Sequence, residues 1–100
     1  MLEHYPGTKE AIDALYEVGA YYLEKKEFDE AIKFYRQFTY NYPTDSRIEN
    51  AMMAIARCYM EKKEWEKALD AYQSYLSKFP QGKEADLAQT QITWIRTYYY

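Results

Sequence analysis

The side chains best suited to chemistry are few and scattered in this sequence. The single histidine, His4, falls among the first few residues, where chain ends seldom hold a fixed geometry. The single cysteine, Cys58, has no companion base at a usable spacing, so a packed thiol is expected in place of a nucleophile. Metal coordination needs several ligands at set spacings, and neither residue has them. We therefore predict no enzyme, no metal site and no cofactor.

The charged residues are explained by helix surfaces. Carboxylates are spread over the expected helix surfaces, as at Glu24, Glu27, Asp29 and Glu30, where they suit helix starts and solvated faces. The lysine pairs at 25–26 and 62–63 are flanked by glutamates, and the net charge is −3, so nucleic-acid binding is not predicted. No apolar run reaches the ~20 residues that span a bilayer, so membrane insertion is not predicted. The first residues also lack the apolar core of a signal peptide.

A repeat of 37 residues organises the whole sequence. The segment EKKEFDEA at 24–31 returns as EKKEWEKA at 61–68. Aromatic–proline pairs keep the same spacing, at residues 5–6, 42–43 and 79–80. Self-similarity at a fixed period is typical of stacked supersecondary units. The predicted single domain, residues 1–100, divides into repeat 1 (6–42), repeat 2 (43–79) and a capping half-repeat (80–100).

Each repeat is predicted to hold two antiparallel helices joined by a tight turn. Apolar residues recur at i, i+4, i+7 and i+11 from Ala11 in the first repeat and from Ile48 in the second. A second apolar stripe starts at Phe28 and at Trp65, after a short charged segment. The predicted helices are 9–25, 28–41, 46–62, 65–78 and 83–98.

Local chemistry predicts some of the helix ends. Ser46 and Glu49 match a capping box, in which each side chain satisfies a free backbone N–H of the other residue. Pro43 and Pro80 are expected to end the preceding helices, because the residue before a proline is pushed out of the α region.

The repeat resembles the tetratricopeptide repeat (TPR), whose signature is a large apolar residue, a Leu–Gly pair, Tyr, Ala, an aromatic residue and a closing Pro. In repeat 1 these positions hold Leu15, Val18, Gly19, Tyr22, Ala31, Tyr35 and Pro43. In repeat 2 they hold Met52, Ile55, Ala56, Tyr59, Ala68, Tyr72 and Pro80. The chain departs from the pattern at Phe38 and Tyr75, where the signature has alanine, and in its period, which is usually about 34. The resemblance implies an all-α fold, an antiparallel helix-pair α-solenoid of about two and a half TPR units with a C-terminal capping helix.

One subset of TPR proteins is especially similar. The 37-residue period, the opening Tyr-Pro and the segment 24–38 resemble the repeats of bacterial cell-envelope proteins, namely β-barrel-assembly lipoproteins and Tol–Pal-associated periplasmic proteins. A periplasmic or cell-envelope location is suggested by this resemblance alone.

The last predicted helix has a polar face. Gln89, Thr93 and Arg96 stand at positions that are apolar or small in the first repeat and would receive the next helix. This helix is therefore interpreted as a cap, which repeat arrays need for solubility.

The resemblance also implies a binding surface, because the first helix of each TPR pair lines the concave face. The implied groove residues are Asp13, Tyr16, Ala20, Leu23, Asn50, Met53, Arg57, Met60, Leu87, Thr90 and Trp94. Tyr, Trp, Met and Arg are enriched at interfaces, although packing between repeats is the competing explanation for each position. Only Arg57 and Asn50 could clamp a C-terminal carboxylate, so we predict a protein or peptide partner with apolar side chains and one acidic group for Arg57.

Two alternatives to a binding scaffold stay open at this stage. The chain could be a structural self-association module that forms homo-oligomers through its ends and through Tyr98, Tyr99 and Tyr100. It could also be an engineered TPR fragment without a ligand of its own. The three tyrosines equally suit a cover for the open end of the last helix.

Overall fold

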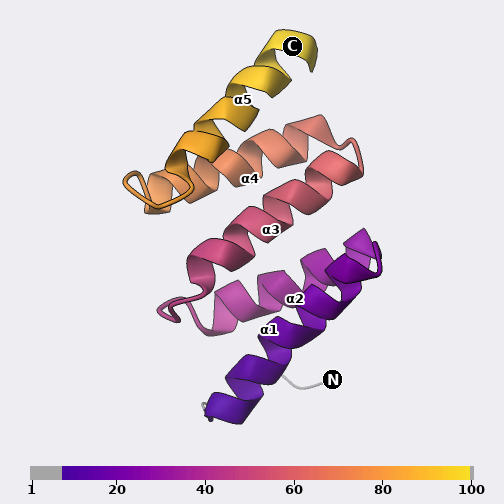
Figure 1. Cartoon of the computed structure of the whole chain (residues 1–100), viewed down its shortest axis with the longest axis vertical. Helices are drawn as coiled ribbons and strands as arrows, with labels where there is room; N and C mark the ends of the chain where they lie inside the picture. Colours follow the sequence, from indigo (N-terminus) through magenta and orange to yellow (C-terminus); the bar gives the residue numbers. More distant parts are fainter. Residues whose placement is uncertain (1–7, 100) are drawn as a thin grey trace.

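Two antiparallel helix pairs and a fifth helix stack along the long axis of the molecule (Figure 1). The computed structural model describes residues 8–99, so His4, the Tyr5–Pro6 pair and Tyr100 lie outside the described residues. Within that range every regular element is helical, which confirms the predicted all-α class. The helices are α1 (Lys9–Glu24), α2 (Phe28–Asn41), α3 (Ile48–Glu61), α4 (Trp65–Lys78) and α5 (Ala85–Tyr99).

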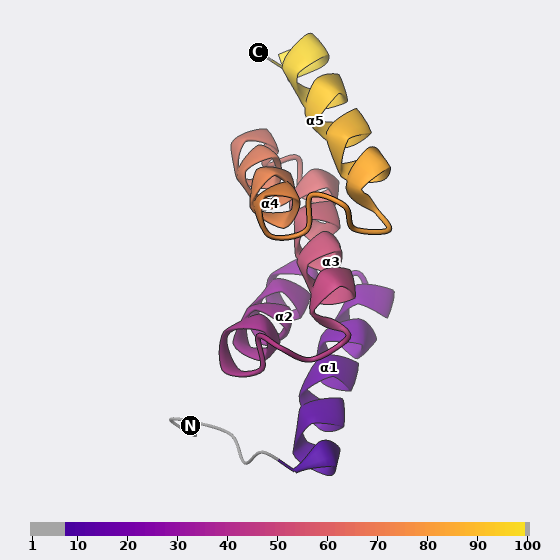
Figure 2. The same ribbon diagram turned by 90° about the vertical axis from the view of Figure 1, so that its left-hand side faces the viewer.

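The helices form two layers. Seen from the side, α1, α3 and α5 lie on one side of the molecule and α2 and α4 on the other (Figure 2). Each helix packs against the helix before it and the helix after it in the sequence. This sequential packing is the arrangement expected of a helical-repeat solenoid.

Helix α3 is the centre of the packing, since both of its sides are buried. One side contributes to a first core, which consists of Leu15, Ala31, Ile32, Tyr35, Phe38, Ile48, Ala51, Ala54, Ile55 and Cys58. The other side contributes to a second core, which consists of Met53, Ala56, Ala68, Tyr72, Tyr75, Ala88, Ile92 and Ile95. Ala31 and Ala68 are fully buried, as the signature predicts for small residues at a close helix contact.

The prolines end the second helices as predicted. Helix α2 ends before Tyr42, which has φ −132° and ψ 60°. Helix α4 ends before Phe79, which has φ −128° and ψ 65°. Both residues precede a proline and both lie outside the α region, because the proline ring crowds the preceding backbone.

The predicted capping box at Ser46 and Glu49 is wrong. Helix α3 begins at Ile48, two residues later than predicted, because Asp45 organises the preceding turn: its carbonyl accepts the Ile48 N–H and its carboxylate accepts the Arg47 N–H at 2.8 Å. Glu49 turns instead to the next loop, where its carboxylate accepts hydrogen bonds from the Tyr75 hydroxyl and from a backbone N–H at residue 83. Helix α5 likewise begins at Ala85, two residues later than predicted.

The charged turns between paired helices contain left-handed residues. Lys26 and Lys63 both have φ 62°, a conformation that side chains with a Cβ adopt at a cost of about 1–2 kcal/mol. Lys26→Gly and Lys63→Gly are therefore each expected to raise the free energy of unfolding by about 1 kcal/mol, measured by urea denaturation. Lys25→Gly is the matched control, because Lys25 has φ −79° and its replacement should bring no gain. Equal effects at Lys25 and Lys26 would contradict this account.

Candidate binding surfaces

The face made by α1, α3 and α5, here called the first-helix face, carries a row of equivalent positions. Ala20, Arg57 and Trp94 are spaced by the 37-residue period and so occupy the same place in three successive first helices. Arg57 is exposed, and Trp94 retains 39% of its surface exposed. A cation and an aromatic side chain therefore occupy equivalent positions of two successive first helices on this face.

The Arg57 side chain makes no hydrogen bond or ion pair with any residue of the described part of the chain. The second row on this face contains Asn50, which is half-buried, and Leu87, which is 42% exposed. An uncommitted guanidinium on the same face as exposed apolar side chains is suited to a partner that carries an acidic group and apolar side chains.

Part of the predicted groove belongs to the core. Met53 is only 2% exposed and packs in the second core under α5, so its assignment as a contact residue is corrected to a packing residue. Leu23 is partly buried against the first core and Met60 against the second. The competing explanation of packing between repeats therefore holds for Met53 and in part for Leu23 and Met60.

Asp13 and Tyr16 are occupied by a contact between the first repeat and the loop before α3. The Arg47 guanidinium lies 2.8 Å from the Asp13 carboxylate and 3.0 Å from that of Asp45. It also lies 5.1 Å from the centre of the Tyr16 ring, which packs edge-on against Phe38. The side-chain hydrogen bond from Arg47 lowers the pKa of Asp45. These two predicted groove residues thus help to hold the repeats together.

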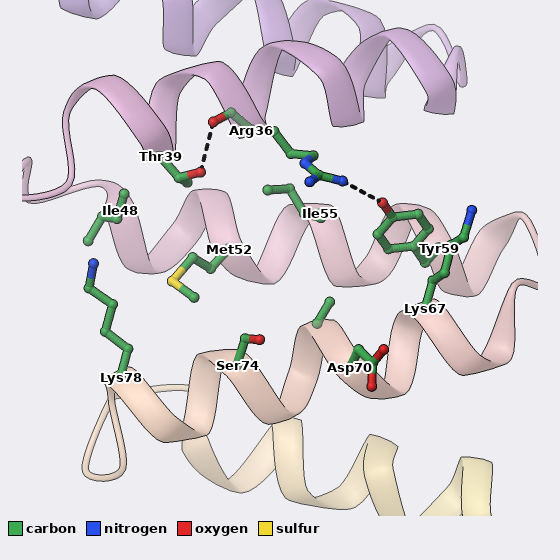
Figure 3. A pocket seen from close by; sticks show the side chains of 11 residues that line it. Arg36, Thr39, Ile48, Met52, Ile55, Tyr59, Lys67, Asp70, Ser74 and Lys78 are labelled. Carbon is green, nitrogen blue, oxygen red and sulfur yellow. Dashed lines mark hydrogen bonds between the residues drawn. The ribbon is translucent and has the colours of Figure 1, made fainter.

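A groove runs along the opposite side of the molecule, between α2 and α4, with α3 as its floor (Figure 3). This open groove has a volume of about 590 Å³. The floor is formed by Ile48, Met52, Ile55 and Tyr59. The walls are formed by Arg36 and Thr39 of α2 and by Lys67, Asp70, Ala71, Ser74 and Lys78 of α4. Arg36 donates a hydrogen bond to the Tyr59 hydroxyl at 3.3 Å, which joins one wall to the floor.

This groove was not predicted from the sequence, because the α3 residues that form its floor belong to the apolar stripe predicted to be core. The signal lay in α4, where Ala71 and Ser74 replace the larger Phe34 and Gln37 of the first repeat. Short side chains in the middle of the wall leave room that the larger ones would fill.

Aromatic residues gather at the C-terminal end of α5. Tyr99 stacks on Trp65 of α4, with ring centres 4.0 Å apart, and Trp94 lies 5.7 Å from Trp65. Tyr98 contacts Trp94 but remains 67% exposed. Tyr99 therefore covers the first turn of α4, whereas most of the Tyr98 side chain is exposed to solvent. The predicted cap residues Gln89, Thr93 and Arg96 are all exposed.

Reactive groups within residues 8–99 are buried or dispersed. Cys58 is fully buried, and burial raises the pKa of its thiol to about 11, so it is protonated at neutral pH. No group of three or more His, Cys, Asp or Glu side chains in this range could hold a metal ion. The described helices are also too short or too polar to cross a membrane.

Sequence comparison adds the family. Residues 8–90 match the YfiO family, described as outer membrane lipoprotein. The chain belongs to the YfiO family. The matched range runs from the cap residue of α1 into α5, so it includes both helix pairs. Family membership confirms the resemblance to bacterial cell-envelope TPR proteins. A comparison with curated protein sequences gives no match.

The family match and the stacked helix pairs agree on a TPR-like role in protein interaction. Stacked helical repeats in general create extended surfaces that bind partner proteins. Within residues 8–99, Arg57, Leu87 and Trp94 are exposed on the first-helix face, and a groove lies between α2 and α4.

Proposed function

We propose that this YfiO-family chain is a non-catalytic scaffold that binds a segment of a partner protein on its first-helix face. Arg57 receives an acidic group of the partner, and Leu87 and Trp94 contact its apolar side chains. The observation that carries the proposal is the exposed Arg57 guanidinium, which has no partner in the described chain and lies in the same row as the exposed Trp94. A cation so placed gives orientation, while aromatic burial supplies most of the affinity.

Other predicted groove residues lie at the edges of the proposed binding surface. Asn50 is half-buried and can contribute a hydrogen bond, while Asp13 and Tyr16 limit the surface on the α1 side through their contact with Arg47. The thiol of Cys58 is buried and protonated at neutral pH, so it does not act as a nucleophile in this scaffold.

The test is selection of a random twelve-residue peptide library displayed on phage against the folded protein. Selected peptides are expected to combine an acidic residue with large apolar residues. Trp94→Ala should weaken their binding about 30-fold, the equivalent of the ~2 kcal/mol typical of an aromatic anchor. Arg57→Glu should weaken acidic peptides about tenfold and leave uncharged ones within about twofold. Fluorescence anisotropy with labelled peptides measures each dissociation constant.

Lys33→Glu is the matched control, because it reverses an exposed charge on α2 and lies outside both surfaces. Selected peptides that tolerate both Trp94→Ala and Arg57→Glu would exclude the first-helix face as their binding site. Sedimentation of the free protein tests the self-association alternative, which the exposed Tyr98 favours. A monomer that binds the selected peptides would exclude it.

A further inference from the structure

The groove between α2 and α4 lies on the opposite layer from the first-helix face (Figures 2 and 3). We propose that this groove binds a short acidic, amphipathic segment of a partner protein. The segment places two or three large apolar side chains on the α3 floor and its carboxylates beside Arg36, Lys67 and Lys78. This inference is independent of the function proposed for the first-helix face.

The floor is suited to apolar side chains. Ile48 and Ile55 are buried at the base, and Met52 and Tyr59 are half-buried beside them. A space of about 590 Å³ admits several aliphatic side chains, and the thioether of Met52 adapts to different shapes. The floor is therefore a continuous apolar strip bounded by two helices.

The charges on the groove walls favour an acidic bound segment. Three cations, Arg36, Lys67 and Lys78, border the groove with one anion, Asp70, although the whole chain carries a net charge of −3. Asp70 has no ion pair within the described residues. Lys78 has none there either and approaches only the Phe79 ring, at 5.9 Å. The local excess of positive charge, against the sign of the molecule, favours an acidic occupant over a basic one.

The spacing of the lysines sets the length of the occupant. Lys67 and Lys78 stand at the two ends of one α4 stripe, with Ala71 and Ser74 between them. Eleven residues of helix rise by about 16 Å, which equals about three turns of a bound helix. Lys67 also lies 3.3 Å from Glu64, but its side chain remains 67% exposed and the contact is a surface pair of small energy.

The probe for this site is a labelled fifteen-residue synthetic helix with leucines along one face and glutamates elsewhere. Two matched peptides replace every glutamate with lysine or every leucine with serine. The acidic peptide is expected to bind, and both matched peptides to bind at least about tenfold more weakly. Its affinity should also fall as salt rises, because the rim charges are exposed.

Charge variants of opposite sign test the location. Lys78→Glu should weaken the acidic peptide at least about threefold, whereas Asp70→Lys should tighten it by a similar factor. Both side chains are exposed, so circular dichroism should show unchanged helicity. Arg57→Glu on the first-helix face and Lys33→Glu on α2 should each leave the affinity within about twofold.

Three results would overturn the inference. Equal binding of the acidic and basic peptides would remove the charge argument. Insensitivity to both Lys78→Glu and Asp70→Lys would remove the groove. Loss of binding in Arg57→Glu alone would move the acidic peptide to the first-helix face, and would leave the function proposed there intact.

Discussion

Raising the pH from about 9 to 12 is expected to unfold the protein cooperatively, because three core tyrosines ionise at lower pH in the unfolded chain than in the folded one. Burial raises the pKa of Tyr35, Tyr72 and Tyr75 to about 12, and Tyr75 also donates a hydrogen bond to Glu49. Tyrosine in an unfolded chain has a pKa of about 10. The stability gained by keeping these hydroxyls neutral is therefore complete below about pH 10 and is lost as the pH rises through about 12.

The expected effect is large. A pKa difference of one corresponds to about 1.4 kcal/mol of unfolding free energy. Three tyrosines whose pKa is raised from about 10 to about 12 therefore contribute a free energy comparable with the ~5–15 kcal/mol stability of a typical domain. The burial of Cys58 acts in the same direction, with a thiol pKa raised to about 11. Far-UV circular dichroism across an alkaline titration measures the transition.

Tyr72→Phe provides the informative variant. The Tyr72 hydroxyl is buried and has no hydrogen-bond partner among the described residues, so its removal should not lower stability at neutral pH. The alkaline midpoint should move to higher pH, because one ionising group is gone. Tyr40→Phe is the matched control, since Tyr40 is 86% exposed and its loss should leave the midpoint in place. Unaltered helicity up to pH 12, or equal shifts in both variants, would contradict the explanation.

Ala31→Leu and Ala68→Leu are each expected to lower the free energy of unfolding by about 1–3 kcal/mol. Both alanines are fully buried where the two helices of a pair approach closely, and three additional heavy atoms would force the helices apart or the side chain off its rotamer. Urea denaturation monitored by circular dichroism measures the change.

Ala14→Leu is the control for these substitutions. Ala14 is an exposed position on α1, so the same enlargement should change stability by about 0.5 kcal/mol or less. If leucine is tolerated at both Ala31 and Ala68, the assignment of these residues to the close helix contact is wrong.

Periodicity in the sequence was sufficient to predict the fold. Apolar stripes at helical spacing identify the buried face of each helix, and the 37-residue repeat predicts that the pairs stack. Pro43 and Pro80 locate helix ends because their effect on the preceding residue is local. The start of α3 was misplaced because the Asp45 carboxylate accepts the Arg47 N–H in the preceding turn. The carboxylate of Glu49 instead accepts a long-range hydrogen bond from Tyr75.

The binding surfaces depended on tertiary structure. Met53 and Trp94 both lie on first helices and both matched the groove pattern, yet α5 covers Met53, while Trp94 remains 39% exposed. The groove between α2 and α4 exists because Ala71 and Ser74 leave space above α3. A periodic pattern assigns each residue to a side of its helix. Whether that side is buried or exposed depends on how the side chains of neighbouring helices fill the space beside it. This is decided only when the helices pack together.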